Sequence, residues 1–169
     1  ANLPALPFLR SLNIENCPVD GSFLKDLQAP SLLFVRLRSA KLNEQCLANL
    51  KQFPKLTNLE VQSHALSLGK AELLAIADLP SLTKLNMLAG SIDVNALPAL
   101  ARAKKLKEIR CESSDCDPNF LQGIIDCKKL EYVFLGARPS DDALRLFKKK
   151  HPRCEISYLG AWQDKKGRK

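Results

Sequence analysis

Glycine, histidine and long apolar runs are scarce in this chain of 169 residues, and each shortage argues against a kind of protein. With only seven Gly and two His, the sequence contains no HExxH, CxxC, GxSxG or glycine-rich phosphate-binding motif. No apolar run reaches the roughly 18 residues of a membrane-spanning helix, and no signal-peptide pattern opens the chain. We therefore expect no catalytic residue, no metal ligand, no cofactor and no membrane span. The alternative explanation for the missing signal peptide is that a leader was removed before Ala1.

The composition is typical of one folded, soluble domain. Hydrophobic residues make up 46% of the chain and charged residues 26%, which is enough for a substantial core. The net charge is +8 and is distributed unevenly. From Asp141 onward, nine Lys or Arg stand against four Asp or Glu, so the last 29 residues carry +5 of that charge.

A nine-residue pattern recurs along the chain at intervals of 23 to 26 residues. Its fourth residue is Leu in six copies, and its seventh and ninth residues are apolar in all six. Three columns held through six copies mark an internal repeat. The copies are LPFLRSLNI (6–14), APSLLFVRL (29–37), FPKLTNLEV (53–61), LPSLTKLNM (79–87), AKKLKEIRC (103–111) and CKKLEYVFL (127–135), with HPRCEISYL (151–159) as a degraded seventh copy.

Each full copy is followed by a second group of apolar residues at helical spacing, such as Phe23, Leu24 and Leu27 in the first unit. A short strand and a helix within about 24 residues cannot bury their apolar faces alone, so neighbouring units must stack on one another. The pattern therefore predicts an α/β solenoid in which each copy of the nonamer is one coil.

The LxxLxL columns, with a further apolar residue five positions later, resemble the leucine-rich-repeat family, and most closely its cysteine-containing and bacterial subtypes. The resemblance implies a horseshoe-shaped solenoid with a parallel sheet on the concave face and helices on the convex face. It covers residues 1–159 as six full repeats and a degenerate terminal one, and it leaves 160–169 as a basic C-terminal tail. The later apolar residues are Val19, Leu42, Leu66, Ile92 and Cys116, whereas the column in which the family prefers Asn, Cys or Thr holds Cys17, Ala40, His64, Gly90, Ser114 and Arg138.

The two ends of the repeat array carry separate expectations. Residues 1–6 (ANLPAL) nearly copy 95–100 (NALPAL), which predicts that the chain begins inside an earlier unit of a longer protein. At the other end, Ser157 occupies a position where the seventh copy needs an apolar residue. Either Leu159 keeps that strand in phase, or the strand shifts by one residue so that Ile156 and Tyr158 face inward.

The spacing of the six cysteines matches neither a zinc site nor a disulfide framework, and repeat register explains most of them as small buried hydrophobic residues. This interpretation favours a reducing compartment and hence the cytoplasm. Cys127 and His151 open consecutive units, about 5 Å apart. A catalytic pair would also need an orienting group and a pocket, so we favour a buried structural pair. The core positions hold Cys46, Cys111, Cys116 and Cys154, and the loop column holds Cys17.

The residues that alternate with the core positions of each predicted strand form the concave surface, where folding does not dictate the side chains. Tyr, Phe and Arg, which are enriched at the energetic centres of protein interfaces, occur there. The alternative for Tyr132 and Phe134 is that terminal segments cover them. The predicted partner-binding residues are Phe34, Arg36, Arg38, Glu60, Lys84, Asn86, Arg110, Tyr132 and Phe134.

Two functions compete for this chain. The first is a non-catalytic protein–protein interaction module that binds a protein partner through the concave surface, which the resemblance also implies. The second is binding of an anion or nucleic acid through the basic C-terminal segment, whose attraction to phosphates would be salt-sensitive. Nucleic acid is the less favoured partner, because no aromatic residues alternate with the basic ones for base stacking. The basic residues are Lys148, Lys149, Lys150, Arg153, Lys165, Lys166, Arg168 and Lys169.

Overall fold

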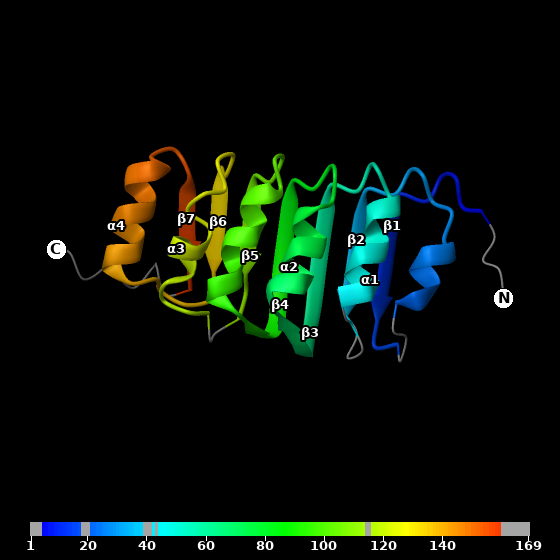
Figure 1. Cartoon of the computed structure of the whole chain (residues 1–169), viewed down its shortest axis with the longest axis horizontal. Coiled ribbons are helices and arrows are strands. Elements are labelled where there is room, and N and C mark those ends of the chain that lie inside the picture. The colour runs from blue at the N-terminus through cyan, green and yellow to red at the C-terminus, as the bar shows by residue number, and fades with distance from the viewer. Residues whose placement is uncertain (1–4, 18–20, 39–41, 43, 114–115, 160–169) are drawn as a thin grey trace.

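A parallel seven-stranded sheet runs the length of the computed structural model, which describes residues 5–17, 21–38, 42, 44–113 and 116–159. The strands are hydrogen-bonded in chain order, and each begins within one copy of the nonamer (Figure 1). The fold is therefore α/β with a parallel sheet. The strands are β1 (Ser11–Glu15), β2 (Phe34–Arg38), β3 (Asn58–Leu68), β4 (Lys84–Ile92), β5 (Glu108–Cys111), β6 (Tyr132–Leu135) and β7 (Glu155–Tyr158).

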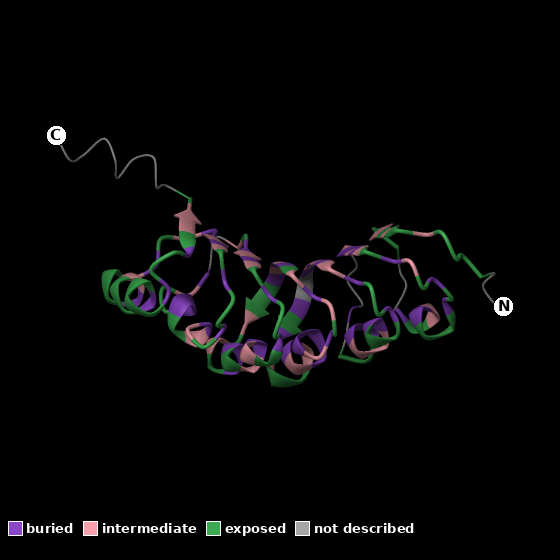
Figure 2. Cartoon of the chain, turned by 90° about the horizontal axis from the view of Figure 1, so that it is seen from above, coloured by how far each residue is buried: buried purple, intermediate pink, exposed green. Residues whose placement is uncertain are grey.

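Short helices cover one face of this sheet and leave the other face open. Figure 2 shows the two layers from above, with the helices along one side and the sheet along the inner side of a gently curved array. Several of the helices are 3-10 rather than α, and the longest of these contains Pro98, which has no backbone N–H to donate. The helices of both types, in chain order, are η1 (Ser22–Asp26), α1 (Glu44–Asn49), η2 (Leu50–Gln52), α2 (Lys70–Ala77), η3 (Val94–Arg102), α3 (Phe120–Gly123) and α4 (Asp141–Lys150).

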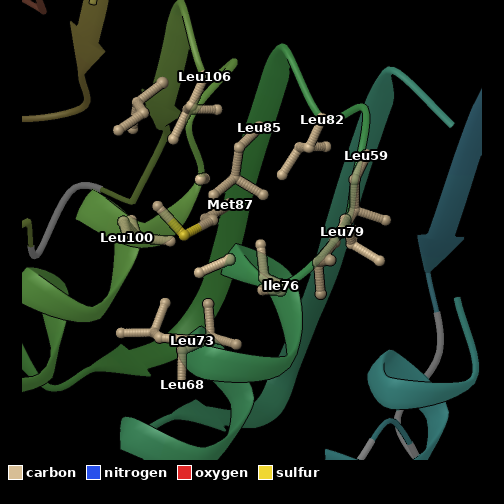
Figure 3. Close-up of a cluster of buried hydrophobic side chains, with 14 of the residues drawn as sticks. Leu59, Leu68, Leu73, Ile76, Leu79, Leu82, Leu85, Met87, Leu100 and Leu106 are labelled. Carbon is tan, nitrogen blue, oxygen red and sulfur yellow. The ribbon is translucent and has the colours of Figure 1, made fainter. Parts of the chain in front are cut away.

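The core lies between the sheet and the helices. Val35 and Leu37 of β2 are buried while their neighbours are half-exposed, as the period of two in a strand requires. Leu85 and Met87 of β4 turn inward in the same way, toward Ile76 of α2 (Figure 3). Each fully buried aliphatic side chain of this kind contributes about 1.5–3 kcal/mol to folding.

The last strand is displaced by one residue relative to the nonamer. In β7, Ile156 pairs with Val133 and Tyr158 pairs with Leu135, so these two residues occupy the core-facing positions. Ser157 pairs with Phe134, and Leu159 is 58% exposed. Of the two alternatives for this strand, the shifted one is therefore correct, because it places apolar side chains rather than a serine against the core.

The sheet ends differently from one unit to the next. β3 and β4 continue well past the nonamer and pair again at Ser67 with Ser91 and at Leu68 with Ile92. β6 stops at Leu135, and Gly136 follows with its N–H donating to the carbonyl of Cys111 at 2.6 Å. A Cβ on Gly136 would lie 2.2 Å from the carbonyl oxygen of Ser113, so the backbones of two adjacent units meet at this glycine.

Tight turns connect the helices to the strands along one edge of the sheet (upper edge in Figure 1). In these turns a backbone N–H bonds back to a carbonyl three residues earlier, as from Leu32 to Ala29 and from Leu56 to Phe53 at 3.1 Å each. The first and last residues of both turns are buried, and the central residues project outward. The turns are thus anchored on the core and hold their central residues at fixed positions.

Some expectations lie outside the described residues. These are residues 1–4 of the ANLPAL segment, Val19, Ala40 and Ser114 of the repeat columns, and the basic tail 160–169 with its Lys165, Lys166, Arg168 and Lys169.

One expectation about the cysteines is wrong. Cys17 is exposed rather than buried, because it follows β1, whose neighbour in the described sheet is β2 alone. The other five cysteines are buried as expected.

Candidate functional site on the outer face of the sheet

The outward-facing side chains of the sheet line up in rows that cross the strands. Within the copies of the nonamer the register is unbroken from β1 to β6, so residues one unit apart are neighbours, about 5 Å from each other. The nine predicted partner-binding residues all lie on this face, with Lys84 exposed and the others half-exposed. One row is Ser11, Phe34, Asn58, Lys84, Glu108 and Tyr132, and the next is Asn13, Arg36, Glu60, Asn86, Arg110 and Phe134.

An ionic cluster joins the first three strands on this face. Glu60 forms an ion pair with Arg36 at 2.9 Å and accepts a hydrogen bond from Arg38 at 3.3 Å, and its side chain is only 15% exposed. Arg38 also lies 3.4 Å from Glu15 of β1. The guanidinium of Arg36 sits over the ring of Phe34, 5.4 Å from its centre. The two arginines are therefore held in place by carboxylates and by an aromatic ring.

A second cluster joins β4, β5 and β6. Glu108 binds Arg110 at 2.6 Å and Lys84 at 3.1 Å. Burial by itself would raise the pKa of Glu108, but the hydrogen bonds and charges of Arg110 and Lys84 together hold its pKa below the ordinary value. The guanidinium of Arg110 lies 5.2 Å from the centre of the Tyr132 ring. Each of the two clusters thus contains an arginine whose guanidinium lies over an aromatic ring.

A shallow hollow of about 230 Å³ separates the two clusters. Asn86 at its floor donates from Nδ2 to Glu112 at 3.0 Å, while its buried Oδ1 has no hydrogen-bond partner among the described residues. An acceptor in that state is unusual, because most buried polar atoms are paired. The hollow is lined by Phe34, Asn58, Glu60, Lys84, Asn86, Glu108, Arg110 and Glu112.

Three carboxylates of this face were not among the nine predicted partner-binding residues. Glu15, Glu108 and Glu112 alternate with the core positions like the predicted residues. Glu15 and Glu108 pair with cations, and Glu112 accepts a hydrogen bond from Asn86. Arg36 and Glu60 are 24 residues apart in the sequence and adjacent in the sheet. Opposite charges one repeat apart were the signal that could have found these pairs.

A second hollow, of about 360 Å³, is lined by the C-terminal part of β4, by the residues that follow β4 and β5, and by Cys111 and Cys116. A hydrogen bond from the Cys116 thiol lowers the pKa of Cys111, and the same bond together with burial raises the pKa of Cys116. No group of three or more His, Cys, Asp or Glu suited to a metal ion occurs within the described ranges. The pair is therefore a thiol pair rather than part of a recognisable metal site.

Cys127 and His151, the expected structural pair, are both buried. Burial raises the pKa of Cys127 to about 12, so this thiol stays protonated at neutral pH. His151 stacks on Phe147 with ring centres 4.5 Å apart, and its Nε2 lies 2.7 Å from the carbonyl oxygen of Ile125. Nucleophilic catalysis needs a thiolate, which the burial of Cys127 disfavours.

The basic residues of the C-terminal segment are partly engaged. Lys148 donates to the carbonyl of Cys154, and Lys150 pairs with Asp126. Lys149 and Arg153 are exposed. These residues lie at the C-terminal end of α4 and in the turn after it, where cations are favoured by the helix dipole.

Comparison with known protein families finds no family model that matches this chain. A search of curated proteins finds no match either. Among the described residues, no helix has the length and apolar character of a membrane span. The repeat columns and the geometry above are therefore the basis for any functional assignment.

Proposed function

We propose that this chain is a non-catalytic protein–protein interaction module of the leucine-rich-repeat type that binds its partner through the outer face of the sheet. The fold part of the proposal is supported by the agreement between repeat and structure: every strand begins in a copy of the nonamer, and the strands pair in chain order. In a horseshoe-shaped solenoid of this type, the sheet face that no helix covers, called here the outer face, is the concave surface and is open to a partner.

The observation that carries the functional part is the pair of cation–aromatic contacts on this face. Arg36 on Phe34 and Arg110 on Tyr132 place residue types that dominate interface energetics where the fold does not need them. Carboxylates hold both arginines before any partner arrives. Ordering these long side chains in advance reduces the entropy that is lost on binding.

The charge of the face favours a protein partner over a polyanion. Across β1 to β6 its cations and carboxylates are equal in number, although the whole chain has a net charge of +8. A neutral, mixed surface selects a partner by complementary contacts rather than by long-range attraction to phosphate. The charged residues of the face are Arg36, Arg38, Lys84 and Arg110 against Glu15, Glu60, Glu108 and Glu112.

The same proposal includes a reducing compartment such as the cytoplasm. Cys111 and Cys116 lie within hydrogen-bonding distance as thiols. An oxidising compartment would favour the closure of such a pair into a disulfide.

The test is to replace Tyr132 and Phe134 together by alanine. The partner is first captured with the wild-type protein and identified, and its Kd is then measured with the purified proteins. Loss of interface anchors should cost about 2 kcal/mol or more, which is a rise in Kd of about 30-fold. Both side chains are only half-buried, so the free energy of unfolding should fall by no more than about 2 kcal/mol.

Phe8→Ala is the matched control, because this aromatic side chain is 89% exposed and precedes the sheet. Its Kd should equal that of the wild type. A folded double variant that binds the partner within threefold of the wild type would show that the binding surface lies elsewhere.

A further inference from the structure

Three consecutive helix-to-strand turns near the C-terminal end of the sheet project basic residues from one edge. Each turn is closed by a backbone hydrogen bond: Leu106 to Ala103 at 3.1 Å, Leu130 to Cys127 at 3.3 Å, and Cys154 to His151 at 3.2 Å. All six of these flanking residues are buried, so the turns are anchored on the core. The exposed central residues are Lys104 and Lys105, Lys128 and Lys129, and Pro152 and Arg153.

The earlier turns of the same chain show that lysine is not needed at these positions. Proline comes first of the two central residues in each of them, and it is favoured there because its fixed φ suits the turn. In the fifth and sixth turns lysine occupies both central positions instead. These lysines therefore call for an explanation other than turn formation. The earlier central pairs are Pro7–Phe8, Pro30–Ser31, Pro54–Lys55 and Pro80–Ser81.

No ion pair neutralises the charge at this edge, although Asp126 lies close enough to Lys128 for the lysine charge to lower the pKa of that carboxyl. The nearby acidic residues are already paired, Glu131 with Lys107, Asp126 with Lys150 and Asp78 with Arg102. Among the described residues, no carboxylate lies within ion-pair distance of the five cations defined here as the basic edge. They are Lys104, Lys105, Lys128, Lys129 and Arg153.

Helix dipoles do not account for the whole basic edge. A cation at the end of a helix is stabilised only within about the last turn. α3 ends at Gly123, five residues before Lys128, so the dipole of this short helix does not reach Lys128 or Lys129. Both lysines are exposed and neither forms an ion pair among the described residues, so they are available to a ligand.

We propose that the basic edge is a docking surface for an acidic segment of the protein partner. This inference rests on the proposed function, because it takes the partner to be a protein lying on the adjacent sheet face. Tyr132 begins β6 only three residues after Lys129. A partner seated on Tyr132 therefore reaches the basic edge with the neighbouring part of its own chain.

The extent of the basic edge favours a short acidic peptide over other anions. Three turns span two strand spacings, about 10 Å, which an extended peptide crosses in about three or four residues. Single-stranded nucleic acid would use aromatic residues interleaved with the cations for stacking, and the central positions of these three turns hold none. A membrane would meet the whole edge, yet the central positions of the first four turns hold only one cation, Lys55.

Fluorescein-labelled hexaglutamate is the probe, with binding followed by fluorescence anisotropy between 20 and 200 mM NaCl. The test variant exchanges both lysine pairs for the Pro–Ser pair that the chain itself uses at Pro30–Ser31. We expect it to melt at or above the wild-type temperature and to bind at least tenfold more weakly at low salt. The substitutions are Lys104→Pro, Lys105→Ser, Lys128→Pro and Lys129→Ser.

A second variant with all four lysines changed to glutamine should lose binding to the same extent, and it decides the matter if the proline variant does not fold. The control removes the same charge from the N-terminal half and should bind within twofold of the wild type. Its substitutions are Lys25→Gln, Lys51→Gln, Lys55→Gln and Lys70→Gln.

Two results would overturn the proposal. One is unchanged hexaglutamate binding by the lysine variants. The other is at least tenfold tighter binding of a 12-nucleotide oligouridylate, a 20-base-pair DNA duplex or phosphatidylserine vesicles than of hexaglutamate. Hexaglutamate has no aromatic group, so replacing Tyr132 and Phe134 by alanine should leave its binding unchanged. Failure at the basic edge is thereby separated from failure of the sheet face.

Discussion

Replacing Gly136 by alanine should destabilise the protein strongly, although it adds one methyl group. The new Cβ would lie 2.2 Å from the carbonyl oxygen and 2.6 Å from the carbonyl carbon of Ser113, whereas ordinary contact begins at 3.4 Å. Both obstacles are backbone atoms and cannot rotate away as a side chain would. The adjacent units must therefore separate at this point, which weakens the bond from Gly136 to Cys111.

The expected loss is about 2–3 kcal/mol in the free energy of unfolding. Overpacking of this kind costs about 1–3 kcal/mol, and a weakened hydrogen bond adds about 0.5–1.5 kcal/mol. Alanine also lowers the conformational entropy of the unfolded chain, which offsets about 0.4–1 kcal/mol of this loss. Urea denaturation followed by circular dichroism measures the difference as a shift of the midpoint at constant slope.

Gly69→Ala is the matched control for this substitution. A Cβ on Gly69 meets only the side-chain oxygen Oε2 of Glu72, at 3.3 Å, and that group can move aside. We expect the control to lose less than about 1 kcal/mol, part of it because alanine caps a helix less well than glycine. If Gly136→Ala unfolds within 0.5 kcal/mol of the wild type, the close approach of the two backbones is refuted.

Two further predictions concern thiols and acid stability. Burial raises the pKa of Cys127 to about 12 and that of Cys154 to about 11, so both thiols react slowly in the native protein. At pH 8 a thiol reagent should therefore modify exposed Cys17 first, and it should titrate about six thiols only after denaturation without reductant. Recovery of only two or four thiols would reveal disulfides. The pKa of Glu108 is lower in the folded protein than its ordinary value of 4.5, so its ion pairs stabilise the fold above that pH and cease to do so as the pH falls through the folded pKa. Glu108→Gln should therefore lose less stability than the wild type between pH 5 and pH 3, by up to about 1 kcal/mol, and parallel pH profiles would contradict this.

The repeat made the strands and their two faces predictable. Val35 and Leu37 could be assigned to the core, and Phe34 and Arg36 to the outer face, because one column pattern fixes the phase in every copy. β7 escaped this logic, since its strand starts one residue early in its unit. Ser157 in an apolar column was the visible sign of the shift.

Helix type and charge pairing could not be predicted in the same way. Apolar residues three or four apart fit a 3-10 helix as well as an α-helix when the segment is only five residues long, as in Ser22–Asp26. The pairing of Arg36 with Glu60 depends on strand register, and the intervals between units vary from 23 to 26 residues. The hollow at Asn86 depends further on side-chain conformations that no sequence pattern specifies.

The chain-order pairing of the strands also has a kinetic consequence. Each strand bonds only to the strand one unit before or after it, so Ser11 meets Phe34 and Asn58 meets Lys84. Every pairing step therefore closes a loop of nearly the same modest length, at nearly the same entropic cost. Folding can begin at any adjacent pair of strands and spread in both directions. Native-state hydrogen exchange should accordingly be slowest in β3 and β4, whose pairing is the longest in the sheet.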